Sequence, residues 1–129
     1  ELFDVALKGC DGFALAVQKT TSETTVVATR CEFSNSWCGA FVNGSLTSAT
    51  FKNCVFNDSQ YHGLIASSES TIHLHGEATA IHSNGGCGIW AQTSSKFFIH
   101  LPSHHNTSYN NGGEDRHTRH GGTITNVED

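Results

Sequence analysis

The sequence predicts an all-β molecule, a right-handed parallel β-helix of about five short coils. Three related stretches carry this prediction: they begin at Cys31, Cys54 and Thr79, and so recur at a nearly constant interval. A period of roughly 20 to 50 residues is typical of a solenoid, in which each repeat adds one turn. Within each repeat the apolar residues alternate over a few positions, which is the period of a half-buried strand, and helical spacing is absent.

A glycine follows the polar turn of each repeat, at Gly39, Gly63 and Gly88, and a second short apolar segment comes after it. We expect these glycines to mark one corner of the coil, where either a positive φ or a lack of room for a Cβ atom requires glycine. Each repeat then supplies two or three short strands and returns to its start one turn higher. The right-handed sense is expected because crossovers between parallel strands are overwhelmingly right-handed.

Residues 1–129 are expected to form one domain with four parts. Residues 1–25 form an atypical first coil in this prediction, and residues 26–101 form the regular coils. Residues 102–122, rich in His, Asn and Gly, are expected to be an irregular loop, and residues 123–129 a last strand. The chain contains no Met, so its first residue is either a processed end or a cut within a longer protein, such as a longer solenoid, and we expect a fragment.

The predicted core is a stack of inward-facing side chains on successive coils. Its expected members are Cys10, Cys31, Cys54, Phe33, Phe56 and Ile81. Cys10 belongs to this set because the stretch Val5–Cys10 can be aligned with the later stretch Val26–Cys31. We interpret the three cysteines as buried thiols that act as small hydrophobes.

A disulfide between Cys31 and Cys54 is the alternative, because adjacent coils lie about 4.8 Å apart and within bridging range. Cys38 and Cys87 are expected at one corner, with His62 on the coil between them. At two coil spacings, roughly 9 to 10 Å, they are predicted not to pair.

Charge and hydropathy argue against two classes of partner. The chain has 7 Lys and Arg against 12 Asp and Glu, without a basic cluster that could follow a phosphate backbone, so nucleic acid is not expected. No apolar run approaches the roughly 20 residues that span a bilayer, so no membrane span is expected.

Three N-glycosylation sequons, at Asn43, Asn57 and Asn106, lie at predicted corners or loops. Their use requires a eukaryotic secretory source, and chance occurrence in a chain rich in Asn, Ser and Thr is the alternative. An extracellular or cell-surface location is the expectation that accompanies them.

The nine histidines are unevenly placed. His73 and His75 alternate on one predicted strand, and alignment of the next repeat puts His100 beside His75 on the outward face. With Glu77 close in sequence, these imidazoles could hold a divalent transition metal, although a plain solvated polar face is the alternative. The same two interpretations apply to the histidines of the tail, which are His104, His105, His117 and His120. No other cofactor is predicted.

Residues 28–91, with the repeats described above, resemble the right-handed parallel β-helix repeats of pectate-lyase-like proteins, alginate epimerases and viral tailspikes. Three stretches, Ile72–Asn84, Ile99–Ser108 and Gly121–Val127, are similar more narrowly to uncharacterised β-helix proteins of aquatic unicellular algae. The first resemblance implies the fold. The second implies no particular chemistry.

Cleavage or epimerisation of acidic polysaccharides is one hypothesis that the resemblance raises. It needs a cation to neutralise the substrate carboxylate and a base on the same outer face. The candidates are Arg30, Lys52, Asp58 and His62. The coil alignment puts Arg30 opposite Asn53 and Lys52 opposite Thr29, so the two cations lean to different faces. No catalytic residue is therefore assigned.

Three functions remain open. The first is a non-catalytic extracellular module, either a structural unit that stacks coil on coil into filaments or a carbohydrate-binding surface. The second is a fragment of a polysaccharide lyase or epimerase, and the third is a viral fibre or tailspike segment. The expected partners are copies of the chain, further coils of its parent chain, or polysaccharide. Stacking is expected because end strands with unpaired backbone groups recruit other strands.

Overall fold

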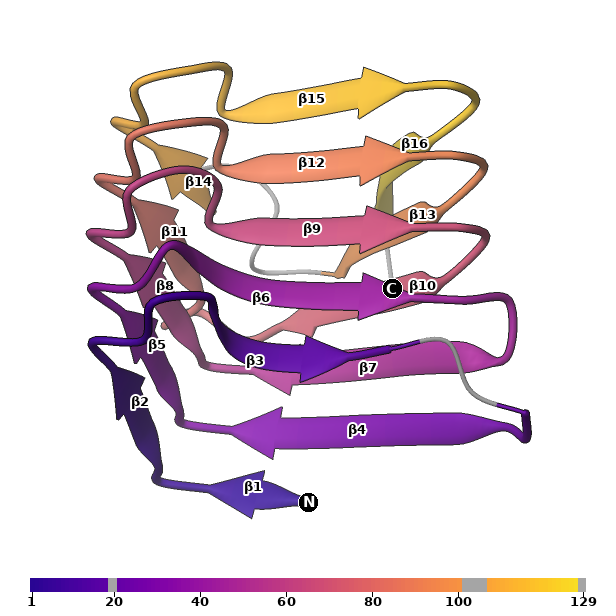
Figure 1. The fold of residues 1–129 in the computed structure, drawn as a ribbon, viewed down its shortest axis with the longest axis horizontal. Coiled ribbons are helices and arrows are strands. Elements are labelled where there is room, and N and C mark those ends of the chain that lie inside the picture. Colours follow the sequence, from indigo (N-terminus) through magenta and orange to yellow (C-terminus); the bar gives the residue numbers. More distant parts are fainter. Residues whose placement is uncertain (19–20, 101–106, 128–129) are drawn as a thin grey trace.

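A computed structural model of the chain describes residues 1–18, 21–100 and 107–127. These residues form sixteen short strands and no helix. Three strands make up each coil, and successive coils stack along one axis (Figure 1). The predicted parallel β-helix of about five coils is therefore confirmed. No described segment is a helix of the length and apolarity that a bilayer crossing requires.

The coils align their strands into three sheets. Sheet I contains β1 (Leu2–Phe3), β4 (Thr24–Thr29), β7 (Thr47–Lys52), β10 (Thr71–His75), β13 (Lys96–His100) and β16 (Thr123–Val127). Sheet II contains β2 (Ala6–Lys8), β5 (Glu32–Ser34), β8 (Val55–Asn57), β11 (Ala80–His82) and β14 (Ser108–Tyr109). Sheet III contains β3 (Phe13–Val17), β6 (Cys38–Asn43), β9 (Leu64–Ser67), β12 (Ile89–Gln92) and β15 (Arg116–Arg119).

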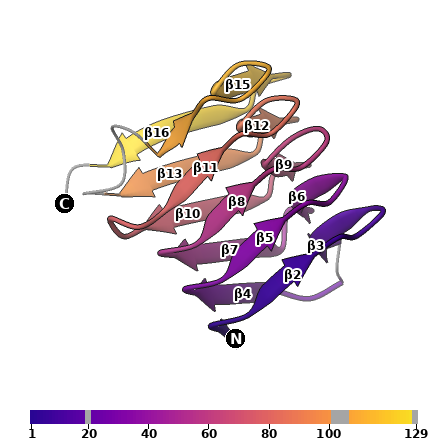
Figure 2. The same cartoon turned by 90° about the vertical axis from the view of Figure 1, so that its left-hand side faces the viewer.

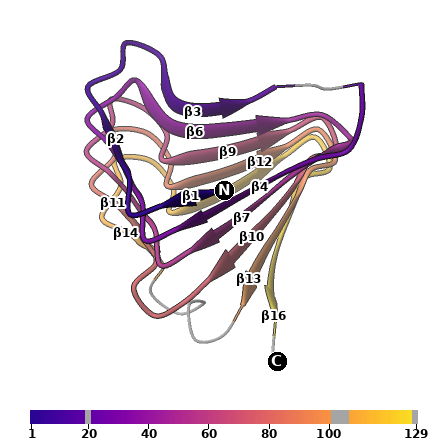
Figure 3. The same ribbon diagram turned by 90° about the horizontal axis from the view of Figure 1, so that it is seen from below.

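Every strand pairs in parallel with the equivalent strand of the next coil; Figure 2 shows β2, β5, β8 and β11 in such a stack. Seen from below, the three sheets form the sides of a three-cornered coil (Figure 3). Alternation of side chains sets the inner and outer faces. In β10, for example, Ile72 and Leu74 are fully buried while His73 and His75 are half-buried on the outside.

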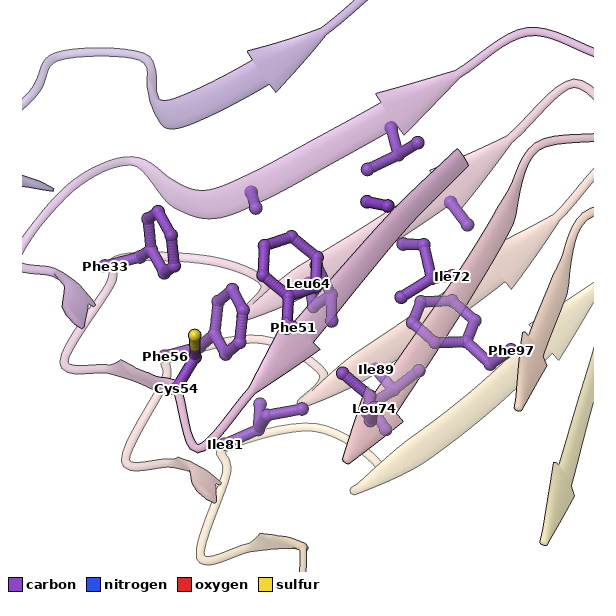
Figure 4. Packing of buried hydrophobic residues seen from close by; sticks show 14 of the residues in the cluster. Phe33, Phe51, Cys54, Phe56, Leu64, Ile72, Leu74, Ile81, Ile89 and Phe97 are labelled. Carbon is purple, nitrogen blue, oxygen red and sulfur yellow. The ribbon is translucent and has the colours of Figure 1, made fainter. Parts of the chain in front are cut away.

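The core contains the predicted row of Phe33, Phe56 and Ile81, which lie in register on β5, β8 and β11 and are fully buried. The rings of Phe33 and Phe56 stack with centroids 4.9 Å apart, and Phe51 meets Phe56 edge-on at 5.0 Å (Figure 4). Offset stacks and edge contacts are the favoured aromatic geometries. This part of the predicted core is confirmed.

Cys10 does not belong to the core row. The first coil pairs with the second so that Ala6 lies opposite Glu32, whereas the predicted alignment put Ala6 opposite Val27. Val5 therefore takes the place inside the coil next to Cys31, while Cys10 lies half-buried at a corner. The alignment was wrong because it matched β2, which belongs to sheet II, with the apolar stretch of β4, which belongs to sheet I.

Cys31 and Cys54 do lie on adjacent coils in the core, with exposed fractions of 2% and 0%. All five cysteines are within the described residues and are free thiols. Burial raises the pKa of the Cys54 thiol to about 11, and its Sγ donates to the Ala28 carbonyl at 3.4 Å. The group thus packs as a small, neutral side chain.

Residues 107–122 are not the irregular loop that their composition predicts. They contain β14 and β15, which pair in parallel with β11 and β12. The boundary at residue 26 also moves, since β4 begins at Thr24. The preceding coils supply backbone donors and acceptors to these polar segments, and that template outweighs weak strand propensity. Residues 102–106, 128 and 129 lie outside the described part of the chain.

The corner glycines are required for space and not for a positive φ. None of Gly39, Gly63 and Gly88 has a positive φ. A Cβ atom on Gly63 would lie 2.6 Å from a methyl carbon of Ile81 and 2.9 Å from the Gly88 carbonyl oxygen, which is too close for real contacts. The second of the two predicted reasons is therefore confirmed.

The two ends of the solenoid differ in chemistry. At the N-terminal coil, Leu2, Leu7 and Leu15 are half-buried and pack against the core. At the C-terminal coil, Arg116 occupies the row of Ile89, and its Nη1 donates to Asn126 Oδ1 at 2.9 Å. The C-terminal end therefore presents polar groups where the N-terminal end presents leucines, a difference that the sequence interpretation did not include.

Candidate functional site

A solvent-open cavity of about 320 Å³ lies at the corner between sheets II and III, on the first three coils. Its lining residues are Gly9, Cys10, Asp11, Asn35, Ser36, Trp37, Asp58 and Gln60. The volume falls at the lower end of the range for small-molecule sites. We define this set as the corner cavity.

The corner conformation explains why short polar side chains collect there. Gly9, Asn35 and Asp58 have φ of 70°, 50° and 57°, the left-handed region, in which Gly, Asn and Asp are the best-tolerated residues. Ser36 closes the wall: its hydroxyl donates to the Ser34 carbonyl and accepts the N–H of Cys10 at 3.2 Å. The polar lining is thus a product of the turn geometry repeated in three coils.

Trp37, which lines the corner cavity, belongs to a row of aromatic side chains on the first three coils. Trp37 and Tyr61 are 41% and 51% exposed, and their ring centroids lie 5.4 Å apart. Phe13 of the first coil meets Trp37 edge-on at 5.5 Å. One aromatic ring from each of three successive coils therefore forms a short row parallel to the solenoid axis.

The corner cavity is acidic. Asp11 and Asp58 line it, and none of its described lining residues is Lys or Arg. The side-chain amide of Asn57 donates to Asp58 Oδ2 at 2.8 Å, which holds that carboxylate at the rim. An anionic ligand is disfavoured here because the two carboxylates make the local electrostatic potential negative.

The four residues considered for lyase chemistry stay apart. Arg30 lies at the corner between sheets I and II, where its guanidinium forms two hydrogen bonds to Asp4, at 2.7 and 3.1 Å. Lys52 lies opposite Thr29, as predicted, and is exposed on sheet I. Asp58 lines the corner cavity, while His62 packs against Trp90 beside sheet III. No common face joins a cation with a base among them.

His73, His75 and His100 do come together on the outer face of sheet I. The rings of His75 and His100 stack as predicted, with centroids 4.0 Å apart and planes 11° from parallel. His73 Nδ1 and His100 Nε2 are 2.9 Å apart. One ring nitrogen from each residue lies within 4.8 Å of the others. Glu77 is exposed and is not part of this group, which we name the histidine cluster.

Burial and the charge of His100 lower the pKa of His73 below its ordinary value. The tail histidines do not join the cluster among the described residues: His117 packs on Trp90 and pairs with Glu114 at 3.1 Å, and His120 accepts from Arg119. His104 and His105 lie outside the described residues.

Two of the three sequons are described. Asn43 ends β6 and Asn57 ends β8, and both side chains are half-buried. Their Oδ1 atoms are buried without a hydrogen-bond partner in the described structure. Asn106 lies outside the described residues.

Sequence reasoning missed the corner cavity and its aromatic rim. A signal was present, since Trp37 and Tyr61 each stand two positions before a corner glycine, Gly39 and Gly63. Equal offsets from an equivalent glycine put the two rings on one edge of the stack. The loop residue Asp11 carried no such signal, because the first coil was aligned in the wrong register.

The fold and these surfaces define a parallel β-solenoid with a polar, aromatic-rimmed corner cavity on one edge and a histidine cluster on another face. No family model, curated protein or solved structure matches the chain.

Proposed function

We propose that this β-solenoid is a non-catalytic, extracellular or cell-surface module that binds a neutral polysaccharide in the corner cavity. The observation that carries the proposal is the combination of Trp37 with carboxylate and amide side chains around about 320 Å³ of open space. Sugar rings present an apolar C–H face, which packs on an aromatic ring, and a rim of hydroxyl groups, which Asp, Asn and Gln side chains can bind.

The direction of the aromatic row supports a chain ligand. Phe13, Trp37 and Tyr61 succeed one another along the axis at about 5.5 Å, so consecutive sugars can contact consecutive coils. Because these rings sit on stacked strands and their corners, little ordering is needed on binding, which lowers the entropic cost.

The charge of the corner cavity separates this proposal from the lyase and epimerase hypothesis. Acidic polysaccharides such as pectate and alginate would bring carboxylates next to Asp11 and Asp58. Like charges in a partly desolvated site repel each other, so we expect uncharged glycans to bind better. The viral fibre hypothesis has no specific observation in its favour.

The experiment is a calorimetric titration of the whole chain with neutral β-linked hexasaccharides of glucose and of N-acetylglucosamine, and with pectate and alginate. Trp37→Ala should weaken neutral-glycan binding by about 2 kcal/mol, roughly thirtyfold, as for a central aromatic contact. Tyr109→Ala is the matched control, since Tyr109 is 38% exposed on sheet II, stacked on His82.

Binding by the Tyr109 variant should equal that of the parent. The proposal fails if no neutral glycan binds, or if both variants bind alike. Sustained release of unsaturated sugars from pectate or alginate, followed by ultraviolet absorbance, would instead support the lyase hypothesis.

A second candidate role is self-assembly through the N-terminal coil. Among the described residues β1, β2 and β3 end their sheets, with Leu2, Leu7 and Leu15 half-buried at that edge. For the 129-residue chain by itself, as used in the assay below, we propose a second copy of the chain as the occupant; in a longer solenoid, further coils of the parent chain would cover the same edge. Since the C-terminal coil presents Arg116 and Asn126, pairing of two N-terminal coils is favoured over an open head-to-tail filament. Light scattering distinguishes the outcomes: a dimer supports the role, whereas a monomer or filaments contradict it.

We also propose that the chain is related to pectate-lyase-like proteins and to the β-helix proteins of aquatic unicellular algae. The parallel coils support this relationship at the level of fold. Glycan attachment at Asn43, Asn57 and Asn106 is likewise proposed for a secreted eukaryotic chain. Peptide mass spectrometry of the protein from its natural source tests the sequons.

A further inference from the structure

Three imidazoles meet on the outer face of sheet I because of strand register. On β10 and β13, Leu74 lies opposite Ile99, and both point inward and are fully buried. Their neighbours His75 and His100 must therefore point outward side by side. His73 lies opposite Phe98 one step earlier, and its ring leans toward His100.

The spacing of the ring nitrogens matches a metal site. In tetrahedral coordination with metal–nitrogen bonds of about 2.0–2.1 Å, two ligand nitrogens lie roughly 3.3 Å apart. His73 Nδ1 and His100 Nε2 are 2.9 Å apart, and all three ligand nitrogens lie within 4.8 Å of one another. Convergence on one ion requires the imidazole rings to turn about their side-chain bonds, which opens the parallel stack of His75 and His100.

The cluster is also held in place before any ion arrives. Its rings are half-buried, and Phe98 stacks on His73 with centroids 5.1 Å apart. The strands beneath are fixed by the buried Ile72 and Leu74. Ligands on rigid strands, packed against an aromatic ring, lose little freedom on binding.

We propose that His73, His75 and His100 bind one divalent transition metal ion, such as Zn²⁺, Ni²⁺ or Cu²⁺. Three nitrogen ligands favour these ions over Mg²⁺ and Ca²⁺, which prefer oxygen. Among the described residues no carboxylate joins the cluster, so the remaining coordination positions fall to water or an external donor.

The neighbouring coils limit which external donor can bind. Lys52 lies opposite His75 on β7 and is exposed, and Val127 lies opposite His100 on β16. The nearby ammonium group favours an anionic donor, for instance a carboxylate or hydroxide. The site is on a different face from the corner cavity, so it stands independently of the proposed glycan binding.

The test uses the whole chain, stripped with chelator and titrated calorimetrically with Zn²⁺, Ni²⁺ and, as a hard-ion control, Mg²⁺. We expect one equivalent of Zn²⁺ or Ni²⁺ to bind and Mg²⁺ not to bind. Each of His73→Gln, His75→Gln and His100→Gln should weaken binding at least about tenfold, the loss seen even for groups that only support a ligand.

His82→Gln is the matched control, because His82 also points outward from a strand and stacks on a ring, that of Tyr109. It should bind the metal as the parent does. A double His104→Gln and His105→Gln variant tests the tail as the source of binding. Absence of one-to-one binding, or binding lost only in the tail variant, overturns the proposal.

A spectroscopic measurement on the unaltered chain tests the site even if a histidine variant fails to fold. Substoichiometric Cu²⁺ should broaden the NMR signals of Phe98 and the three cluster histidines before those of His82. Uniform broadening, or broadening that starts at His82, contradicts the assignment.

Discussion

Phe56→Ala is the substitution that tests the core of the solenoid most directly. Phe56 is fully buried on the middle coil, stacked on Phe33 at 4.9 Å and met edge-on by Phe51 at 5.0 Å. Removing the ring loses its transfer free energy and leaves a cavity, since the parallel strands on either side cannot collapse into the space. The expected cost is about 3–5 kcal/mol.

That loss is a large fraction of the roughly 5–15 kcal/mol that stabilises a typical domain. The assay is urea unfolding followed by circular dichroism, with the free energy of unfolding taken from the linear extrapolation. Phe3→Ala is the matched control, because Phe3 is 53% exposed at the edge of sheet I, and should change stability by less than about 1 kcal/mol. Equal free energies for the Phe56 variant and its parent would refute the assignment of the core.

Three further predictions follow from single sites. Gly63→Ala should destabilise the fold by about 1–3 kcal/mol in the same urea assay, because the new Cβ would lie 2.6 Å from a core methyl group. Gly12→Ala is the control and should be nearly neutral, because Gly12 has open space around it. A larger loss of stability for Gly12→Ala than for Gly63→Ala would contradict the packing argument. Burial, followed by the charge of a nearby histidine, lowers the pKa of His62 below 6.5, and its Nδ1 accepts a backbone N–H at 2.9 Å. Because the unfolded chain then binds the proton more readily, the His62 contribution to stability is complete above about pH 6.5 and is lost as the pH falls. His62→Gln should reduce the dependence of the free energy of unfolding on pH in this range. An unchanged pH dependence would exclude His62 as its source. Cys54, with its pKa raised to about 11 and no exposed surface, should react with a thiol reagent only after unfolding, whereas half-buried Cys10 should react in the native state. Mass spectrometry of labelled peptides measures the order of labelling. Early labelling of Cys54 would contradict its burial.

The regular coils could be predicted because their information is local and repeated. The repeat period aligned Phe33 with Phe56 and His75 with His100, and both pairs do stack in the structure. Side chains on a strand alternate strictly, so once the period is known the inner and outer faces follow. The glycine corner was recognised for the same reason, although only the packing around Gly63 shows that space and not φ requires it.

Other features depend on contacts between coils that no short stretch of sequence contains. The register of the first coil places Val5, and not Cys10, next to Cys31, because hydrogen bonding to the second coil decides it. The polar strand β15 forms because β12 offers it a complete edge, against its own weak propensity.

The corner cavity is likewise a tertiary feature, since Asp11, Trp37 and Gln60 come from three different coils. The period, the strand faces and the histidine stack can be predicted from sequence because each depends on spacing along the chain. The first register, the polar C-terminal end and the cavity cannot, because each depends on how separate coils meet in space.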